Sequence, residues 1–256
     1  VIMNFDRTCN YKCPSCRVDL IVESSKGIER IEKTIDEIDT YYSVNVKTLY
    51  ITGTGDPFVS VSFRNYLRNF NPTKYPKLTR IHFHTNASMW TKEMWDSMPN
   101  VHKYVTTCEI SIDAGTCDTY ENKTRLGGKW DILYNNLHFI FTKIPNLDFV
   151  RLTFVVQNNN YFEMCGFVEM SDYFQKMNGM KTEVNFIHIN NWGTFTSSEF
   201  TIKNVGNTGH PENNLFKLES IAGISAIFKF KQSDPIVIAL CISNIASGCI
   251  KKSEST

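Results

Sequence analysis

Residues 1–16 read VIMNFDRTCNYKCPSC, and this stretch is the most informative part of the chain about its fold. Residues 1–6 are mostly apolar and predict a strand, which leads directly into a loop that carries Cys9, Cys13 and Cys16. Parallel α/β folds build their active sites at the carboxyl ends of their strands. The stretch therefore predicts a sheet fold and also the edge of the sheet where the chemistry is expected.

Strand-like and helix-like segments alternate beyond this loop. Ile28, Ile31, Ile35, Ile38 and Tyr41 recur at helical spacing, and four later segments show similar spacing, one of them a short helix capped by a threonine at position 91. The expected strands are residues 1–6, 47–52, 78–85, 106–112, 148–156 and 183–189. Such alternation implies right-handed βαβ units and a parallel sheet. Six units are too few for a closed eight-stranded barrel, so we expect an α/β fold, a partial (β/α)6 TIM-like barrel with a short irregular C-terminal extension.

The alternation ends near residue 193, where Gly, Asn, Thr and Ser become dominant up to residue 214. We therefore expect two parts, a barrel over residues 1–192 and an extension over residues 193–256. The chain opens on an apolar run without an initiating Met, so we expect it to be a fragment whose natural N-terminus lies upstream.

Composition excludes several classes of protein. The 256 residues contain 27 Lys and Arg against 26 Asp and Glu, so charge gives no case for a nucleic-acid or anionic-membrane partner. A hydrophobic content of 42% argues against disorder, and no apolar run reaches the 18 residues of a membrane helix. Eight Cys in a chain of this size, three of them within eight positions, favour a reduced, cytoplasmic compartment.

The spacing of Cys9, Cys13 and Cys16 favours a metal centre. A structural zinc site takes four ligands, and no His or Cys follows until His82. Three thiolates suit a cubane iron–sulfur cluster that leaves one iron open to a ligand outside the protein. Two alternatives stay open: a non-enzymatic module that binds zinc with a ligand from another chain, and three small buried residues without a metal.

The cysteine pattern C-x3-C-x2-C after the first strand resembles the signature of the radical S-adenosylmethionine (radical SAM) enzymes. Three later strand ends resemble other motifs of this family. The fourth strand and its loop are most similar to the branch with C-terminal SPASM or twitch extensions. The matching segments are Thr54-Gly55-Asp56-Pro57, Thr85-Asn86-Ala87, Ser111-Ile112-Asp113-Ala114, and Tyr120 with Arg125-Leu126-Gly127-Gly128.

The resemblance implies a [4Fe–4S] cluster and S-adenosyl-L-methionine, which the reduced cluster cleaves to a 5′-deoxyadenosyl radical that abstracts a hydrogen atom from substrate. The implied cluster ligands are Cys9, Cys13 and Cys16. The backbone of Thr54, Gly55 and Asp56 would meet the methionine ammonium, Ser111 the ribose or carboxylate, and Arg125 the carboxylate. Asn86 is a further expected contact of the cofactor, and the resemblance identifies no catalytic residue.

The resemblance also implies partners: a peptide or small-molecule substrate and a one-electron donor such as flavodoxin or ferredoxin. Gln157, Asn158, Asn190 and Asn191 lie at later strand ends and could touch cofactor or substrate, or simply satisfy turns. His82, His84 and His188 are better explained as structural histidines.

The chain departs from the family pattern in the second-strand motif, where Thr54 replaces a glycine and Asp56 a glutamate, and at two further places. Ser15 stands where the family usually has an aromatic residue or His, so an adenine contact would come from elsewhere, with Tyr11 as one candidate. Cys241 and Cys249 are too few for an auxiliary cluster, which predicts an extension without its own cluster. A third possibility is therefore a degenerate member that keeps the cluster and has lost turnover.

Overall fold

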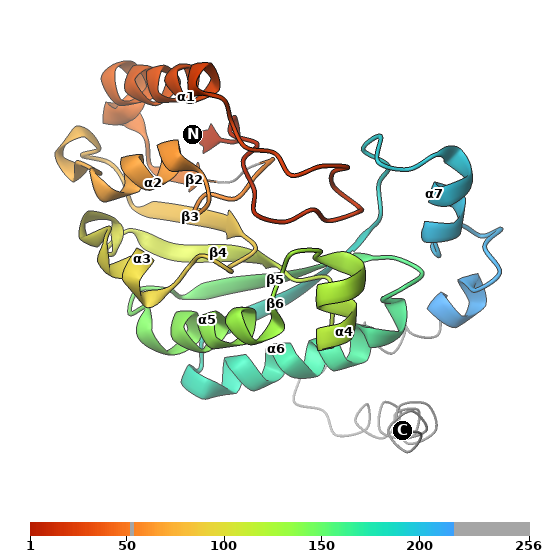
Figure 1. The fold of residues 1–256 in the computed structure, drawn as a ribbon. Helices are drawn as coiled ribbons and strands as arrows, with labels where there is room; N and C mark the ends of the chain where they lie inside the picture. The colour runs from red at the N-terminus through yellow and green to blue at the C-terminus, as the bar shows by residue number, and fades with distance from the viewer. Residues whose placement is uncertain (52–53, 218–256) are drawn as a thin grey trace.

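Six parallel strands form one sheet in the computed structural model, which describes residues 1–51 and 54–217 (Figure 1). The strands follow the chain in order, and each pairs in parallel with the next. Their bounds are β1 Ile2–Met3, β2 Thr48–Ile51, β3 Arg80–Thr85, β4 Val105–Ser111, β5 Phe149–Val156 and β6 Lys181–His188. This order and direction confirm the predicted α/β fold built as a partial (β/α)6 barrel.

Helices return the chain between strands and lie along the outer side of the sheet, except for the last helix, which follows β6 and stands apart from the sheet (Figure 1). The α-helices are α1 Ser25–Glu37, α2 Val61–Arg68, α3 Lys92–Asp96, α4 Cys117–Thr119, α5 Trp130–Lys143, α6 Met164–Asn178 and α7 Ser197–Lys203. Short 3-10 turns span Ser43–Asn45, Pro72–Lys74, Pro99–Val101 and Tyr161–Glu163, and π-turns span Ile38–Tyr42 and Tyr120–Thr124. The predicted threonine cap is confirmed, since the Thr91 hydroxyl accepts the amide N–H of Met94.

The two faces of the sheet differ in character. Alternate side chains of the central strands, among them Phe83, Ile110, Leu152 and Phe154, are fully buried in the core with residues of the outer helices. The intervening side chains of the same strands are mostly polar and point to the opposite, inner face, because strand side chains alternate. The apolar outer face therefore forms the core of the fold, whereas the polar inner face does not take part in it.

Two predicted boundaries were wrong for physical reasons. β1 pairs only over Ile2–Met3, because the Asp6 carboxylate accepts the Thr8 amide at 2.8 Å and turns the chain out of the sheet. The helical spacing predicts Tyr41 on the same face as Ile31 and Ile35, yet Tyr41 is 72% exposed. The helix widens into a π-turn at Ile38–Tyr42, which rotates Tyr41 away from the stripe set by Ile31 and Ile35.

The described part of the C-terminal extension packs on the end of the barrel. Phe216 lies against Tyr161 and His188, and the Asn158 amide donates to the Lys203 carbonyl at 3.0 Å. Cys241 and Cys249 lie outside the described residues. Among residues 1–51 and 54–217, no helix has the length and apolar character that crossing a bilayer requires.

Candidate metal centre and cofactor site

The three cysteines lie in the loop between β1 and α1, at the carboxyl end of the strands (Figure 1). The Cys13 carbonyl accepts the amides of Cys16 and Arg17 at 2.9 and 3.0 Å, which folds the loop into a tight turn. Cys9 and Cys13 are buried and Cys16 is exposed. Burial raises the pKa of the Cys9 thiol, and it raises that of Cys13 to about 11. Binding of a metal to these sulfurs would therefore release protons.

Each of the three sulfurs accepts an N–H from a different side chain. The pairs are Asn86 Nδ2 with Cys9 Sγ at 3.8 Å, Arg125 Nη1 with Cys13 Sγ at 3.6 Å, and Arg17 Nη2 with Cys16 Sγ at 3.6 Å. Such donors favour sulfur in its negatively charged form and orient it, as the supporting shell of a metal site does. This arrangement suits three thiolate ligands of an iron–sulfur cluster.

A mononuclear metal site needs its ligands closer together than a cluster does. Within the described residues, no three His, Cys, Asp or Glu side chains are grouped closely enough to bind one metal ion. A cubane cluster is wider than one ion, so this finding bears on the mononuclear zinc alternative only.

The turn after β2 packs directly on the cysteine loop. A Cβ on Gly55 would lie 2.2 Å from the Thr8 carbonyl oxygen, so only glycine allows this approach. The Asp56 amide donates to the same carbonyl at 2.8 Å. The Thr54 carbonyl accepts Arg17 Nη2 at 2.5 Å. The three predicted residues of this turn thus lie against the loop that carries the cysteines.

The Asp56 side chain points into the protein instead. Its carboxylate accepts the amides of Phe58 and Asn86 at 3.0 and 2.8 Å and the hydroxyl of Thr85 at 2.8 Å. Burial raises its pKa, and these three donors oppose the rise. Asp56 therefore ties the ends of β2 and β3 together through its side chain, while its backbone N–H donates to the cysteine loop.

Asn86, the residue predicted at the end of the third strand, lies beside the first cysteine. Its Nδ2 donates to Asn10 Oδ1 at 3.0 Å, and its Oδ1 accepts the Ser88 amide and hydroxyl at 2.9 and 2.6 Å. The following residue, Ala87, has a positive φ of 62°, which L-residues seldom adopt. The strand end is thus held in a specific turn against the cysteine loop.

Arg125 is more fully engaged than the sequence indicated. Its Nη2 pairs with Asp113 at 2.8 Å, its Nε donates to the Ile112 carbonyl at 3.3 Å, and its Nη1 reaches Cys13. Burial opposes its charge, but Asp113 and Cys13 outweigh burial and raise its pKa above the usual range. Asp113 has a φ of 60°, so the loop accepts backbone strain to make this pair. An incoming carboxylate would have to share the guanidinium with both.

A row of charged and polar side chains crosses the inner face of the sheet, and sequence reasoning missed most of it. His84, Glu109, Arg151 and Glu183 are register partners on β3 to β6. Arg151 lies 3.5 Å from Glu109 and 3.1 Å from Glu183. The signal was available, because polar residues recur at alternate positions in three successive strands, as His82 and His84, as Thr107, Glu109 and Ser111, and as Arg151 and Thr153.

The predicted residue Ser111 belongs to the same inner face. Its hydroxyl lies 2.9 Å from His84 Nε2, and His82 Nδ1 lies 2.9 Å from the Thr107 hydroxyl. Burial lowers the pKa of both histidines, that of His82 to about 4. Both rings are therefore neutral at physiological pH and act as hydrogen-bonding groups.

The later candidates separate into two groups. Gln157 Nε2, Asn158 Oδ1 and Asn159 Oδ1, directly after β5, are buried and have no hydrogen-bond partner within the part of the chain that the structure describes. Buried amide atoms without a protein partner are commonly satisfied by water or by a ligand. Asn190 is exposed, and the Asn191 side chain closes a turn with Gly193 and Phe195.

Two further candidates have structural explanations. His188 lies against Phe216, so its place in the extension contact accounts for it. Tyr11 is 1% exposed, and its hydroxyl lies 2.9 Å from that of Tyr120. Tyr11 therefore packs the cysteine loop onto the segment that precedes Arg125.

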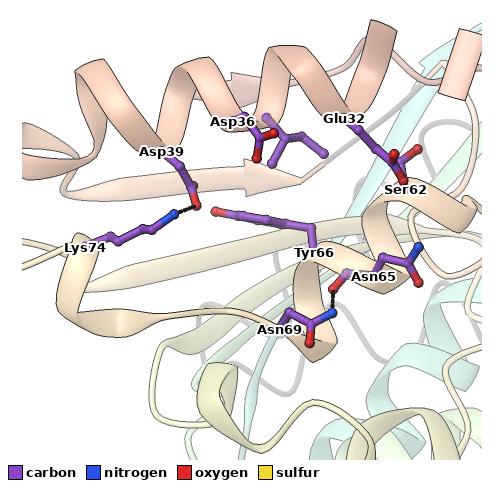
Figure 2. Close-up of a pocket in the computed structure, with 9 residues that line it drawn as sticks. Glu32, Asp36, Asp39, Ser62, Asn65, Tyr66, Asn69 and Lys74 are labelled. Atoms are coloured by element: carbon purple, nitrogen blue, oxygen red, sulfur yellow. Dashed lines mark hydrogen bonds and ion pairs between the residues drawn. The ribbon is translucent and has the colours of Figure 1, made fainter. Parts of the chain in front are cut away.

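A pocket of about 320 Å³ lies between α1 and α2 (Figure 2). It is lined by acidic and amide side chains, and Asp39 in it pairs with Lys74 at 2.9 Å. The pocket belongs to the outer helical layer, whereas the cysteines lie at the carboxyl edge of the sheet. It is therefore not the place where the cysteine chemistry would occur.

The barrel is shared with a solved structure. The FeFe-hydrogenase maturase HydG from Carboxydothermus hydrogenoformans matches with a TM-score of 0.51 at 14% identity, over 90% of this chain and 50% of that one. The likeness is one of fold. Since the chain spans half the length of HydG, it corresponds to one part of that protein.

Two other solved structures overlap less well. TYW1 with a lysine-pyruvate adduct bound matches at 18% identity and a TM-score of 0.44, over 68% of this chain and 59% of that one. The anSMEcpe structure with bound AdoMet and the Cp18Cys peptide matches at 16% identity and a TM-score of 0.47, over 74% of this chain and 50% of that one. No protein-family profile and no curated protein sequence matches the chain.

Proposed function

We propose that the chain is a radical SAM enzyme with one [4Fe–4S] cluster on Cys9, Cys13 and Cys16. The observation that carries the proposal is that each of these sulfurs has its own N–H donor at the carboxyl edge of a partial barrel. The fold likeness to HydG supports the barrel, and the motifs at four strand ends support the family. When bound and reduced, the cluster supplies the electron that splits S-adenosylmethionine into methionine and a 5′-deoxyadenosyl radical.

The cofactor would lie along the strand ends, with the backbone of Thr54, Gly55 and Asp56 toward the methionine ammonium. Gly55 supports this role because it brings the turn against the cysteine loop without a side chain in between. Asn86 and Ser111 would lie along the same strand ends and contact the cofactor there. The buried amides of Gln157 and Asn158 fit a ligand that offers hydrogen-bonding groups, as adenine and ribose do.

Arg125 would serve the methionine carboxylate only while it also holds Asp113. Its Nη1 lies 3.6 Å from Cys13 Sγ, so the guanidinium stands beside the cluster. Arginine binds carboxylates in a planar fork, and since Nη1 and Nη2 already donate to Cys13 and Asp113, a cofactor carboxylate would share these donors with them.

The substrate would be polar. The interior of a closed barrel is usually filled by branched apolar side chains, yet here the inner face carries Glu109, Arg151 and Glu183 in one row. Buried or half-buried charges need hydrogen-bonding partners, and a peptide or a polar small molecule offers them. The proposal includes a one-electron donor such as flavodoxin or ferredoxin, a cytoplasmic location, and a barrel over residues 1–192 followed by an extension.

The test is anaerobic reconstitution with iron and sulfide, followed by electron paramagnetic resonance with and without S-adenosylmethionine and an assay for 5′-deoxyadenosine. We expect a cluster signal that changes with S-adenosylmethionine, together with formation of 5′-deoxyadenosine. Cys13→Ala should lose iron and both readouts, whereas Cys117→Ala, which removes an exposed thiol elsewhere, should keep them.

The other outcomes contradict all or part of the proposal. Full iron content in Cys13→Ala, or bound zinc and no iron in the native chain, would refute the cluster assignment. An intact cluster that ignores S-adenosylmethionine would identify a degenerate member without turnover.

A further inference from the structure

Arg17 follows the third cysteine and connects three segments of the site. Its Nη1 donates to the Arg7 carbonyl at 3.0 Å, and its Nη2 reaches the Thr54 carbonyl at 2.5 Å and Cys16 Sγ at 3.6 Å. One guanidinium thus joins the exit from β1, the turn after β2 and the last cysteine of the loop.

Arg17 is also a buried cation without a negative partner. The residue is 8% exposed, yet none of the ion pairs found among residues 1–51 and 54–217 includes it. Arg125, the other buried arginine beside a cysteine, has Asp113 at 2.8 Å. A buried charge that lacks a counter-charge is costly, so the position of Arg17 calls for an anion beside Cys16.

We propose that Arg17 is a positioning residue for the cluster, which supplies the missing negative charge. Arg17 holds Cys16 against the turn at Thr54 and raises the reduction potential of the cluster. Reduction adds one negative charge, and a cation that donates an N–H to sulfur stabilises the reduced form more than the oxidised form. This inference rests on the proposed function.

The experiment is a redox titration of the reconstituted protein, followed by electron paramagnetic resonance, with iron content and circular dichroism measured on the same samples. In Arg17→Met we expect the ratio of reduced to oxidised cluster at a fixed potential to fall about tenfold, which for one electron is a shift of about 59 mV to lower potential. Arg17→Lys keeps the charge but cannot span both Thr54 and Cys16, so we expect an intermediate shift.

The matched control is Lys12→Met, which removes one positive charge from the same loop. Lys12 is 49% exposed and pairs with Asp19, so solvent screens it and the potential should stay near that of the native chain. Should Arg17→Met fail to fold, the comparison of Arg17→Lys with Lys12→Met carries the test.

The results separate this inference from the proposed function. An unchanged potential in Arg17→Met and Arg17→Lys would overturn the inference and leave the cluster assignment standing. Equal shifts in Arg17→Met and Lys12→Met would also overturn it, because they would report net charge rather than the contact to Cys16. Absence of iron from the native chain would refute the proposed function itself.

Discussion

Removal of the Arg125 guanidinium should destabilise the metal-free chain strongly. Arg125 and Asp113 are 2.8 Å apart, and their side chains are 11% and 2% exposed. Arg125→Met would leave the Asp113 carboxylate buried without its counter-charge, although the Val155 amide still donates to it at 2.7 Å. Loss of one partner of a buried ion pair costs about 3–5 kcal/mol, so we expect a loss in that range at neutral pH.

The assay is urea denaturation of the metal-free protein, followed by far-UV circular dichroism. A surface pair of the same length serves as the control: Lys123 and Asp118 are also 2.8 Å apart, with side chains 39% and 66% exposed. Lys123→Met should change the free energy of unfolding by less than about 1 kcal/mol. Burial, and not distance, then explains the difference between the two variants.

The double variant Asp113→Asn with Arg125→Met should recover part of the lost stability, because it removes the unpaired charge. The deficit of Arg125→Met should also shrink at acidic pH, where Asp113 takes up a proton. A loss below about 1 kcal/mol in Arg125→Met, or one no larger than that of Lys123→Met, would refute the reasoning.

Three further perturbations test other parts of the structure. Burial lowers the pKa of His82 to about 4, so the native chain should lose about 2 kcal/mol, discounted for partial exposure, as pH falls from 6.5 to 4. His82→Gln should flatten that slope in urea titrations, and an unchanged slope would contradict the assignment. Thr91→Ala removes the acceptor of the Met94 amide and should lower the unfolding free energy by about 1 kcal/mol. Gly55→Ala should force the turn off the Thr8 carbonyl and reduce iron uptake in the reconstitution assay; full uptake would show that the close approach is dispensable.

The fold could be predicted from the sequence because its signal is repeated. Each strand–helix unit carries the same periodicity, and one misplaced boundary does not change the order of the units. The errors arose where a single side chain or a local change of helix type intervened. The Asp6 carboxylate ends β1 early by accepting the Thr8 amide, and the π-turn at Ile38–Tyr42 moves Tyr41 out of the buried stripe.

The site was less accessible to sequence reasoning. Motifs located Cys9, Asn86 and Arg125 at the correct edge, but the partners of these side chains are distant in sequence. The contact between Arg125 and Cys13 spans 112 positions, and that between Asn86 and Cys9 spans 77. Arg17 was overlooked because nothing in its spacing reveals that it is buried and reaches Thr54.

Because side chains alternate along β3 to β6, successive residues of these strands serve different purposes. Positions such as Phe83, Ile110 and Leu152 are constrained by volume, since any change there is felt throughout a close-packed core. Their neighbours one step along the strand face the opposite side, where hydrogen bonds and ion pairs, such as that of Arg151 with Glu109, constrain them. Substitutions at Glu109 or Arg151 would therefore change the charge of the inner face and leave the close packing of the outer face in place. Changes at every second residue of these strands would thus alter one face of the sheet while the other face stays packed.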